Sequence, residues 1–314
     1  MVVRVTSSTS QQLTGLAYVL LAAFGYGWLY VLAKWAYAGQ ASPTMVLVVR
    51  FGVAAIVLWT WLLFRRRPLP GGSRALGLIA LGGLFSLSAL AMFAALERLP
   101  ASTAALLQYT YPAMVAMATA VVLREPLRPR HWVAVVLCTL GGWLTTAPGS
   151  SAVDVLGVGL ALASAASYAL YIVVSSRAAR GVSGDVGAAL VVTTAAVVNA
   201  ALGSASATIR TDVGLEAWAA MVGIALFSTV LALGAFLAGV ARAGAVPAAV
   251  ASAFEPVVAV ALAAALLGEA IGSFQVLGGV LVLSAVLLLA STRARASAAG
   301  PARTPAPPSA SPSP

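Results

Sequence analysis

Glu255 is the residue with the clearest capacity for chemistry, because it is a single carboxylate inside a long apolar stretch. No other charged side chain occurs from Ala243 to Leu267. Glu255 lies about ten residues, or about 15 Å of helix rise, into this run. A charge at the centre of a bilayer costs about 2.5–3.5 kcal/mol on insertion scales, so such groups usually face a cavity or a partner. A carboxyl there can bind a cationic or amino group, or carry a coupling proton.

Pro256 follows Glu255 directly in the sequence SAFEPVVAV, residues 252–260. Proline has no N–H, so a helix that passes through this point bends and leaves the carbonyl of Ser252 without its usual donor. A water, a neighbouring side chain or a substrate must satisfy that carbonyl inside the membrane. We therefore expect Ser252 and Glu255 to form a polar notch.

A second polar notch is expected 144 residues earlier, around Pro112. This proline frees the carbonyl of Gln108 in the same way. Tyr111 stands at the position that the glutamate occupies in the later notch. The two notches are predicted to line a substrate cavity at similar depth, although only one of them carries a charge.

Arg50 is another ionisable residue in the middle of an apolar run. One interpretation makes it the permanent partner of Glu255, in which case the pair would only hold helices together. The alternatives are that Arg50 belongs to the cavity, or that its long side chain reaches out to the membrane surface. The sequence leaves these interpretations open.

Tyrosines form the next set of candidates for the cavity. Tyr26 and Tyr30 are four residues apart and so share one helical face, and Tyr168 occupies a similar region of the second half. Aromatic walls suit apolar or aromatic substrates. The alternative is that these rings face lipid or pack between helices.

The elements that must position these residues are membrane-spanning helices. The chain is 61% hydrophobic and 8% charged, with a mean hydropathy of +1.00, whereas about a quarter of the residues of soluble domains are charged. Runs of about 20 apolar residues are long enough to span and too long for barrel strands. The runs cover residues 13–35, 44–64, 74–95, 101–123, 131–148, 155–176, 186–206, 214–235, 245–267 and 272–291. The sequence predicts an all-α polytopic membrane protein with ten transmembrane helices.

The basic residues follow the loops. With the N-terminus inside, 14 of the 18 Lys and Arg residues fall in cytoplasmic segments, so the positive-inside rule places both termini in the cytosol. The net charge of +10 therefore reflects topology, and we expect the partners to be the lipid bilayer and a small-molecule substrate and not a nucleic acid.

An internal repeat organises the chain. A shift of 144 residues aligns Pro112 with Pro256 and Glu125 with Glu269. Because five helices per half is an odd number, the halves are predicted to cross the membrane in opposite senses, the arrangement from which many secondary transporters are built. The predicted units are a cytosolic N-terminus (1–12), a first five-helix repeat (13–148), a linker (149–154), a second repeat (155–291) and a disordered cytosolic tail (292–314).

The duplicated pattern resembles a known family. Each half has a fourth helix that runs from proline through an apolar stretch to glutamate, YPAMVAMATAVVLREPL at 111–127 and EPVVAVALAAALLGEAI at 255–271. With the order of ten helices, this is similar to the drug/metabolite transporter superfamily, in particular its EamA-type members. The resemblance covers about residues 13–291. It implies a multi-pass carrier of the plasma or inner membrane that often exports amino acids or related compounds through a cavity between the halves.

Other classes of function have less support. The chain has no GxxxxGK[ST] loop for an ATP-driven pump, and one His and one Cys predict neither a metal site nor a catalytic constellation. We expect no enzyme activity and no cofactor. A channel is less favoured than alternating access, because the two broken helices are related by symmetry. Two transport functions stay open, namely export of amino acids or similar metabolites, with or without coupled protons, and export of lipophilic cations and drugs.

Overall fold

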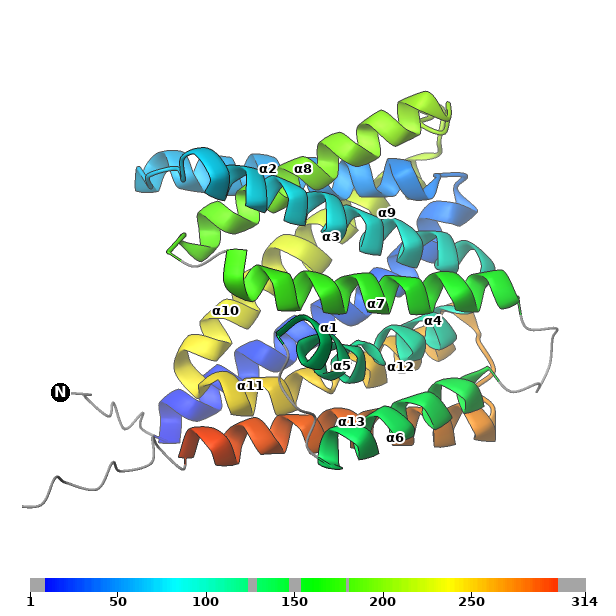
Figure 1. Cartoon of the computed structure of the whole chain (residues 1–314). Coiled ribbons are helices and arrows are strands. Elements are labelled where there is room, and N and C mark those ends of the chain that lie inside the picture. Colours follow the sequence, from blue (N-terminus) through cyan, green and yellow to red (C-terminus); the bar gives the residue numbers. More distant parts are fainter. Residues whose placement is uncertain (1–8, 124–128, 147–153, 179–180, 299–314) are drawn as a thin grey trace, which may run out of the picture.

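Most of the described residues form helices in a computed structural model, which describes residues 9–123, 129–146, 154–178 and 181–298. Figure 1 shows their arrangement. In chain order they are α1 (Thr9–Ala38), α2 (Pro43–Arg65), α3 (Gly72–Arg98), α4 (Ala101–Gln108), α5 (Tyr111–Leu123), α6 (Pro129–Thr145), α7 (Val155–Ala178), α8 (Gly184–Ala205), α9 (Leu215–Ala225), η1 (Leu226–Leu231), α10 (Ala232–Ala243), α11 (Ala245–Ser252), α12 (Glu255–Leu267) and α13 (Ser273–Ala298). Within these ranges no strand occurs, which confirms the all-α fold class.

Eight helical stretches of the described chain are long and apolar enough to cross a bilayer, and Ser273–Leu289 is a shorter apolar helix. Several of the eight combine consecutive helices, since Ala101–Val122 contains α4 and most of α5 and Leu215–Ala243 contains α9, η1 and α10. The chain is therefore a multi-pass membrane protein. The count of ten crossings and the inverted relation of the halves stay predictions.

Both proline-containing spans are interrupted where the sequence predicts a bend. α4 ends at Gln108 and α5 begins at Tyr111, while α11 ends at Ser252 and α12 begins at Glu255. Each interruption, residues 109–110 and 253–254, ends two residues before the proline. The proline then occupies the first turn of the next helix, where its missing N–H costs no helical hydrogen bond. The 144-residue shift maps α4 onto α11 and α5 onto α12 residue for residue.

A third interruption lies inside the predicted run 214–235. Between α9 and α10 the chain forms the π-helical turn η1. In such a turn each carbonyl accepts a hydrogen bond from the N–H five residues later, and not four residues later as in an α-helix. The Thr229 hydroxyl donates to the carbonyl of Ile224, five residues back, at 3.1 Å. The sequence LFSTVL contains neither glycine nor proline, so nothing in it announced this turn.

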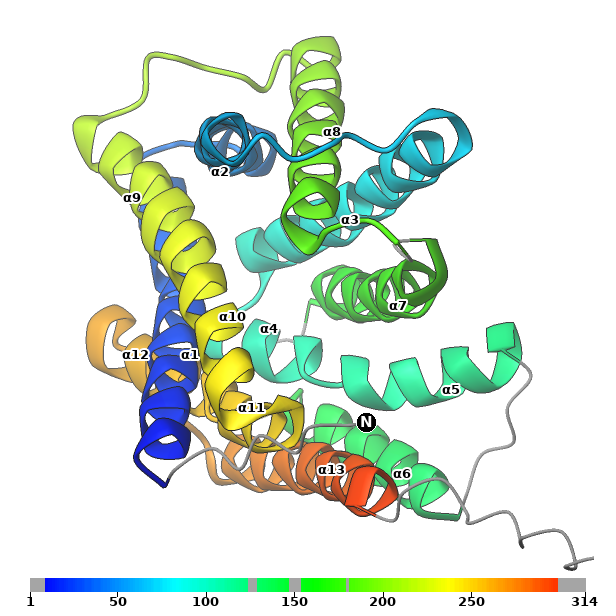
Figure 2. The ribbon, with the colours of Figure 1, turned by 90° about the vertical axis from the view of Figure 1, so that its left-hand side faces the viewer.

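Helices far apart in the sequence pack along one another in pairs. The main pairs are α1 with α10, α3 with α7, α2 with α8 and α6 with α13, and Figure 2 shows them surrounding the middle of the molecule. The 144-residue shift maps α1 onto α7 and α3 onto α9–α10. The α1–α10 pair in one half therefore corresponds to the α3–α7 pair in the other. α6 and α13 meet backbone to backbone, because a Cβ added at Gly278 would lie 2.5 Å from the carbonyl oxygen of Gly141.

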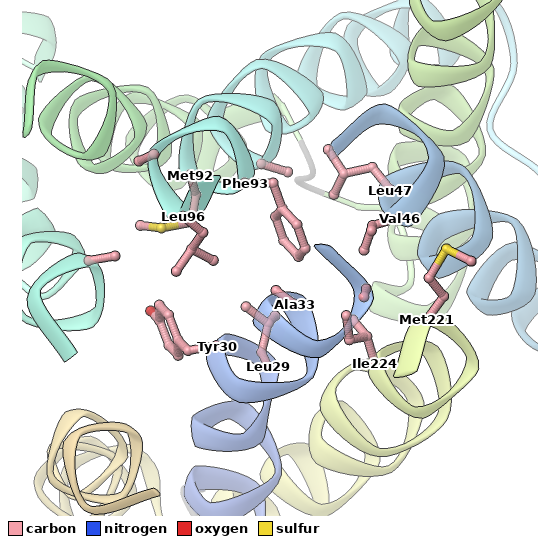
Figure 3. Close-up of a cluster of buried hydrophobic side chains, with 14 of the residues drawn as sticks. Leu29, Tyr30, Ala33, Val46, Leu47, Met92, Phe93, Leu96, Met221 and Ile224 are labelled. Carbon is pink, nitrogen blue, oxygen red and sulfur yellow. The ribbon is translucent and has the colours of Figure 1, made fainter. Parts of the chain in front are cut away.

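The end of the bundle away from the chain's N-terminus is filled by apolar side chains. At this end α1 finishes, and a Cβ at Gly39 would touch Ala217. The cluster in Figure 3 occupies the space between α1, α2, α3 and α9. Its labelled members are Leu29, Tyr30, Ala33, Val46, Leu47, Met92, Phe93, Leu96, Met221 and Ile224. We call this group the apolar plug.

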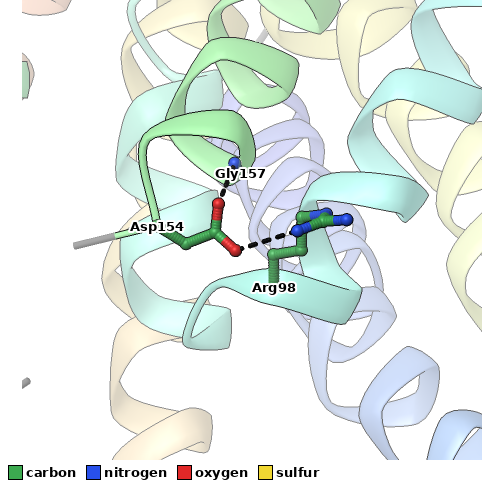
Figure 4. Close-up of polar contacts among 3 residues, drawn as sticks. All are labelled: Arg98, Asp154 and Gly157. Atoms are coloured by element: carbon green, nitrogen blue, oxygen red, sulfur yellow. Dashed lines mark hydrogen bonds and ion pairs between the residues drawn. The ribbon is translucent and has the colours of Figure 1, made fainter. Parts of the chain in front are cut away.

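Two carboxylates fasten helix N-termini at the same end. Gly268, at φ 66, ends α12 in the left-handed region that glycine tolerates, and the next residue, Glu269, accepts from the backbone N–H groups of Ala101 (2.6 Å) and Ser102 (3.0 Å) at the start of α4. Asp154 accepts from the N–H of Gly157 at 2.9 Å and from Arg98 at 3.1 Å (Figure 4). Glu269 thus joins the two halves, while its repeat counterpart Glu125 lies outside the described residues.

Candidate functional site

A cavity of about 400 Å³ opens in the middle of the bundle, where the two broken helices face each other. This volume falls within the roughly 300–1,000 Å³ of typical small-molecule sites. All eight candidate residues line it, namely Tyr26, Tyr30, Arg50, Gln108, Tyr111, Tyr168, Ser252 and Glu255. In the sequence, the helix-breaking residues Pro112 and Pro256 directly follow Tyr111 and Glu255. Whether these side chains bind a substrate stays a prediction.

The cavity is closed toward the apolar plug. On α1 its lining extends from Val19 to Tyr30, and beyond Tyr30 the buried Ala33 and Ala36 belong to the packed core. On α8, which begins at the other end of the bundle, the lining residues lie in the first half of the helix, from Ala188 to Val192. The hollow therefore reaches from the helix breaks toward the end of the bundle at which α1 begins.

Glu255 is the first residue of α12, and its side chain is half-buried on the cavity wall. The free N–H groups and the dipole of a helix N-terminus favour a negative charge at this position. No cation pairs with it, because the ion pairs within 4.0 Å in the described chain lie elsewhere. They are Arg67–Asp185, Arg98–Asp154 and Arg210–Asp212. The permanent Arg50–Glu255 pair considered from the sequence is therefore not formed.

The carbonyl that Pro256 frees is satisfied from the other half of the protein. The hydroxyl of Tyr109 donates to the carbonyl oxygen of Ser252 at 3.1 Å. Tyr109 is itself buried, with 4% of its surface exposed. One tyrosine in the interruption of the first broken helix therefore fixes the interruption of the second.

Arg50 projects from α2 into the cavity and is held by the π-helical turn. Its Nε donates to the hydroxyl oxygen of Thr229 at 3.0 Å. Its guanidinium carbon lies 5.1 Å from the centre of the Phe51 ring and 5.7 Å from that of Phe93, which are cation–π distances. The third interpretation of Arg50, a side chain reaching the membrane surface, does not fit this placement.

Aromatic rings form a continuous wall beside these polar groups. Neighbouring ring centres are 5.1 to 6.0 Å apart along the series, distances at which aromatic pairs attract one another. In order along the wall the rings are Phe51, Phe85, Tyr171, Tyr168, Tyr111 and Tyr109. Tyr168, for which the sequence left a cavity role and a lipid-facing or packing role open, lies among the rings of the cavity.

A second hollow, of about 340 Å³, lies between α4, α5, α6 and α7. Its walls are almost wholly apolar, with Met114, Met117 and Trp143 among them. The hydroxyls of Thr110 and Thr139 on this wall donate to carbonyls of their own helix turns, so they offer little to a polar ligand. The described residues also contain no group of three His, Cys, Asp or Glu side chains placed to hold a metal ion. The central cavity is therefore the candidate site.

Comparison with known proteins places this arrangement in a family. The model of the EamA-like transporter family matches the chain twice, over residues 13–147 and 155–291. The chain belongs to the EamA-like transporter family. This confirms the resemblance to EamA-type members of the drug/metabolite transporter superfamily, and it makes the protein a membrane transporter.

Individual relatives agree with the family assignment. The EamA-like protein is 27% identical to the uncharacterized transporter YcbK of Bacillus subtilis (strain 168) over 291 residues, which cover 87% of this chain and 91% of YcbK. A solved crystal structure is similar with a TM-score of 0.61 at 22% identity, covering 92% of this chain and 99% of the matched chain. The latter likeness concerns the fold alone.

Sequence reasoning on this EamA-like protein did not single out Tyr109 or Thr229, which also line the cavity. Tyr109 could have been found, because it adjoins Gln108 at a predicted helix break and a tyrosine hydroxyl is long enough to cross to the opposing helix. Thr229 gave no such sign, since it lies in an apolar run and reaches the cavity through the π-helical turn. The neighbouring Ser228 also lines the cavity, and its fully buried hydroxyl has no hydrogen-bond partner in the described chain.

Proposed function

We propose that this transporter exports small metabolites that carry an amino group, such as amino acids or related compounds, across the plasma membrane by alternating access. The observation that carries the proposal is the unpaired carboxylate of Glu255 on the wall of a closed-ended central cavity. An ammonium group that enters the cavity would supply the missing positive charge. The interaction is strong in this setting because little water competes for the carboxylate.

The helix arrangement supports alternating access. The repeat maps the two broken helices onto each other residue for residue, and it exchanges the α1–α10 and α3–α7 contacts. Two packings of nearly equal energy are expected for halves related in this way, one with the cavity closed at each end. The apolar plug would then be the closed end in the present arrangement.

The charges of the loops bear on the direction of transport. Loop charges favour cytosolic termini, which would make the end at which α1 begins the cytoplasmic end. The cavity would then face the cytosol, as an exporter's cavity must when it collects its substrate. Proton coupling is compatible with a carboxylate at the site and is tested below.

Export of lipophilic cations or drugs is the second candidate, and one observation favours it. Glu255 shares the cavity with the six-ring aromatic wall, and aromatic faces attract cations. Such a site would accept a delocalised cation without needing a carboxylate on the substrate. Counterflow in proteoliposomes with a zwitterionic amino acid and with a lipophilic cation would distinguish the two functions.

The decisive variant is Glu255→Gln, measured at fixed protein abundance with and without a pH gradient. We expect transport to fall about tenfold or more, because a hydrogen bond to a charged group contributes about 1.5–3 kcal/mol. Glu216→Gln is the matched control, since Glu216 is an exposed glutamate in the first turn of α9. An unchanged rate and pH dependence in Glu255→Gln would contradict the proposal.

A further inference from the structure

Arg50 forms no ion pair with the acidic side chains of the described residues. The described acidic side chains that form ion pairs within 4.0 Å are Asp154, Asp185 and Asp212, none of them with Arg50. A buried charge is retained at a cost of several kcal/mol when it has no partner. A guanidinium kept in this condition inside the membrane therefore points to a partner that arrives from outside the chain.

The orientation of Arg50 leaves one edge of the guanidinium available. Nε is used by Thr229, and the rings of Phe51 and Phe93 lie at cation–π distances from the guanidinium carbon. Nη1 and Nη2 carry four of the five N–H groups of an arginine, and none of them has an acceptor among the described residues. Because Arg50 lines the cavity, these donors are presented to whatever occupies it.

Thr229 fixes that orientation through the π-helical turn. Its hydroxyl hydrogen is directed to the carbonyl of Ile224 at 3.1 Å, so a lone pair is left to accept from Arg50 Nε at 3.0 Å. An arginine held at Nε loses little freedom when its terminal edge binds a planar group. The π-helical turn therefore places the Thr229 hydroxyl on the cavity wall, where it holds Arg50 in one orientation.

The geometry points to a carboxylate as the group that Arg50 binds, and to substrates that carry both a carboxylate and an amino group. This inference rests on the proposed transport function and specifies its substrate class. A carboxylate has the planar, two-oxygen form that matches the two terminal nitrogens of an arginine. Glu255 lies on the same wall and attracts Arg50 without pairing with it. A zwitterion that bridges them would neutralise both charges.

The repeat gives this site a single orientation. The 144-residue shift takes Arg50 to Thr194, Glu255 to Tyr111, and Thr229 to Phe85, so neither charge has a charged counterpart in the other half. Arg50 and Glu255 line the same cavity together with Tyr26 and Tyr30. A zwitterion can therefore bind with its carboxylate toward α2 and η1 and its amino group toward α12, but not in reverse.

Counterflow in proteoliposomes with four matched probes tests the inference. The probes are phenylalanine, phenylalaninamide, phenethylamine and 3-phenylpropionate, chosen because their common ring suits the aromatic wall while the two charges are removed one at a time. The wild-type protein is expected to prefer phenylalanine. Arg50→Lys is expected to raise the KM for phenylalanine about tenfold or more, since a lysine cannot make the bidentate contact, and to leave transport of the two amines nearly unchanged.

Thr229 is tested as a positioning residue with two variants. Thr229→Val removes the hydroxyl at constant shape and should raise the KM for phenylalanine a few-fold without changing that for phenethylamine, whereas Thr229→Ser should restore the wild-type KM. The inference is overturned if Arg50→Lys lowers transport of all probes equally, or if the wild-type protein moves the amines but not phenylalanine. Failure of wild-type liposomes to move any of these probes or any amino acid in a panel would overturn the proposed function itself.

Discussion

Removal of the Glu269 carboxylate should weaken the joint between the two halves more than any other single loss at the plugged end. Glu269 accepts from the N–H groups of Ala101 and Ser102, and from the Ser102 hydroxyl, at 2.5–3.0 Å. Both residues of α4 are buried, at 0% and 1% exposure. In Glu269→Ala these donors lose their acceptor in a place that water reaches poorly.

The magnitude follows from the number of donors left unpaired. Each buried donor without a partner costs about 1–3 kcal/mol, and loss of an N-cap costs about 0.5–2 kcal/mol. Because Glu269 itself is half-buried, water will replace part of the lost contact, and we expect a net loss of about 2–4 kcal/mol in the free energy of unfolding. At about 2–4 °C per kcal/mol for chains of 150–250 residues, the melting temperature should fall by about 4 °C or more.

Thermal unfolding of the purified protein in detergent, followed by tryptophan fluorescence, measures this loss. Asp154→Ala is the matched control, since Asp154 also caps a helix and binds a neighbouring group at the same end (Figure 4). Its side chain and that of Arg98 are 34% and 44% exposed, so water can take over their contacts and the melting temperature should change little. Equal losses in the two variants would refute the reasoning from buried donors.

Three further predictions concern stability. Gly278→Ala should lower the free energy of unfolding by about 1–3 kcal/mol, because the new Cβ would lie 2.5 Å from the backbone of α6. Gly83→Ala is the control: its Cβ would have nothing within 4 Å, so the change should be neutral or stabilising by up to about 1 kcal/mol. The melting temperatures of the two variants measure the difference. Tyr109→Phe leaves the Ser252 carbonyl without its donor and should destabilise by about 1–3 kcal/mol in chemical unfolding, and an unchanged value would show that water replaces the hydroxyl. The pKa of Asp154 is lowered below its ordinary value of 3.8 by the Gly157 N–H and by Arg98, so its small stabilising effect is full at neutral pH and is lost as the pH falls through the lowered pKa. The small difference in melting temperature between wild type and Asp154→Asn should therefore disappear once the pH is below that lowered pKa.

Local features of the sequence were sufficient to predict the helices and the two helix breaks. Long apolar runs have to be helical in a bilayer, because the backbone must satisfy its own hydrogen bonds there. A proline in the interior of a long helical run interrupts the helix, so the breaks near Pro112 and Pro256 could be predicted from the sequence. The repeat then predicted that both breaks lie at one level, and the cavity contains residues from both.

The contacts between helices were decided by tertiary structure alone. The sequence offered Glu255 as a partner for Arg50, but the partner in the structure is Thr229, 179 residues away in the chain. Tyr109 and Glu269 each act on a helix of the other half. Hydrophobic periodicity and proline act within one helix, so their effects can be predicted from the sequence. The contact between two side chains depends on how distant helices pack, and here also on a π-helical turn that no residue type in the sequence indicates. The sequence by itself thus determined which polar groups lie inside apolar runs, and the packing determined that the two charges face the cavity without meeting.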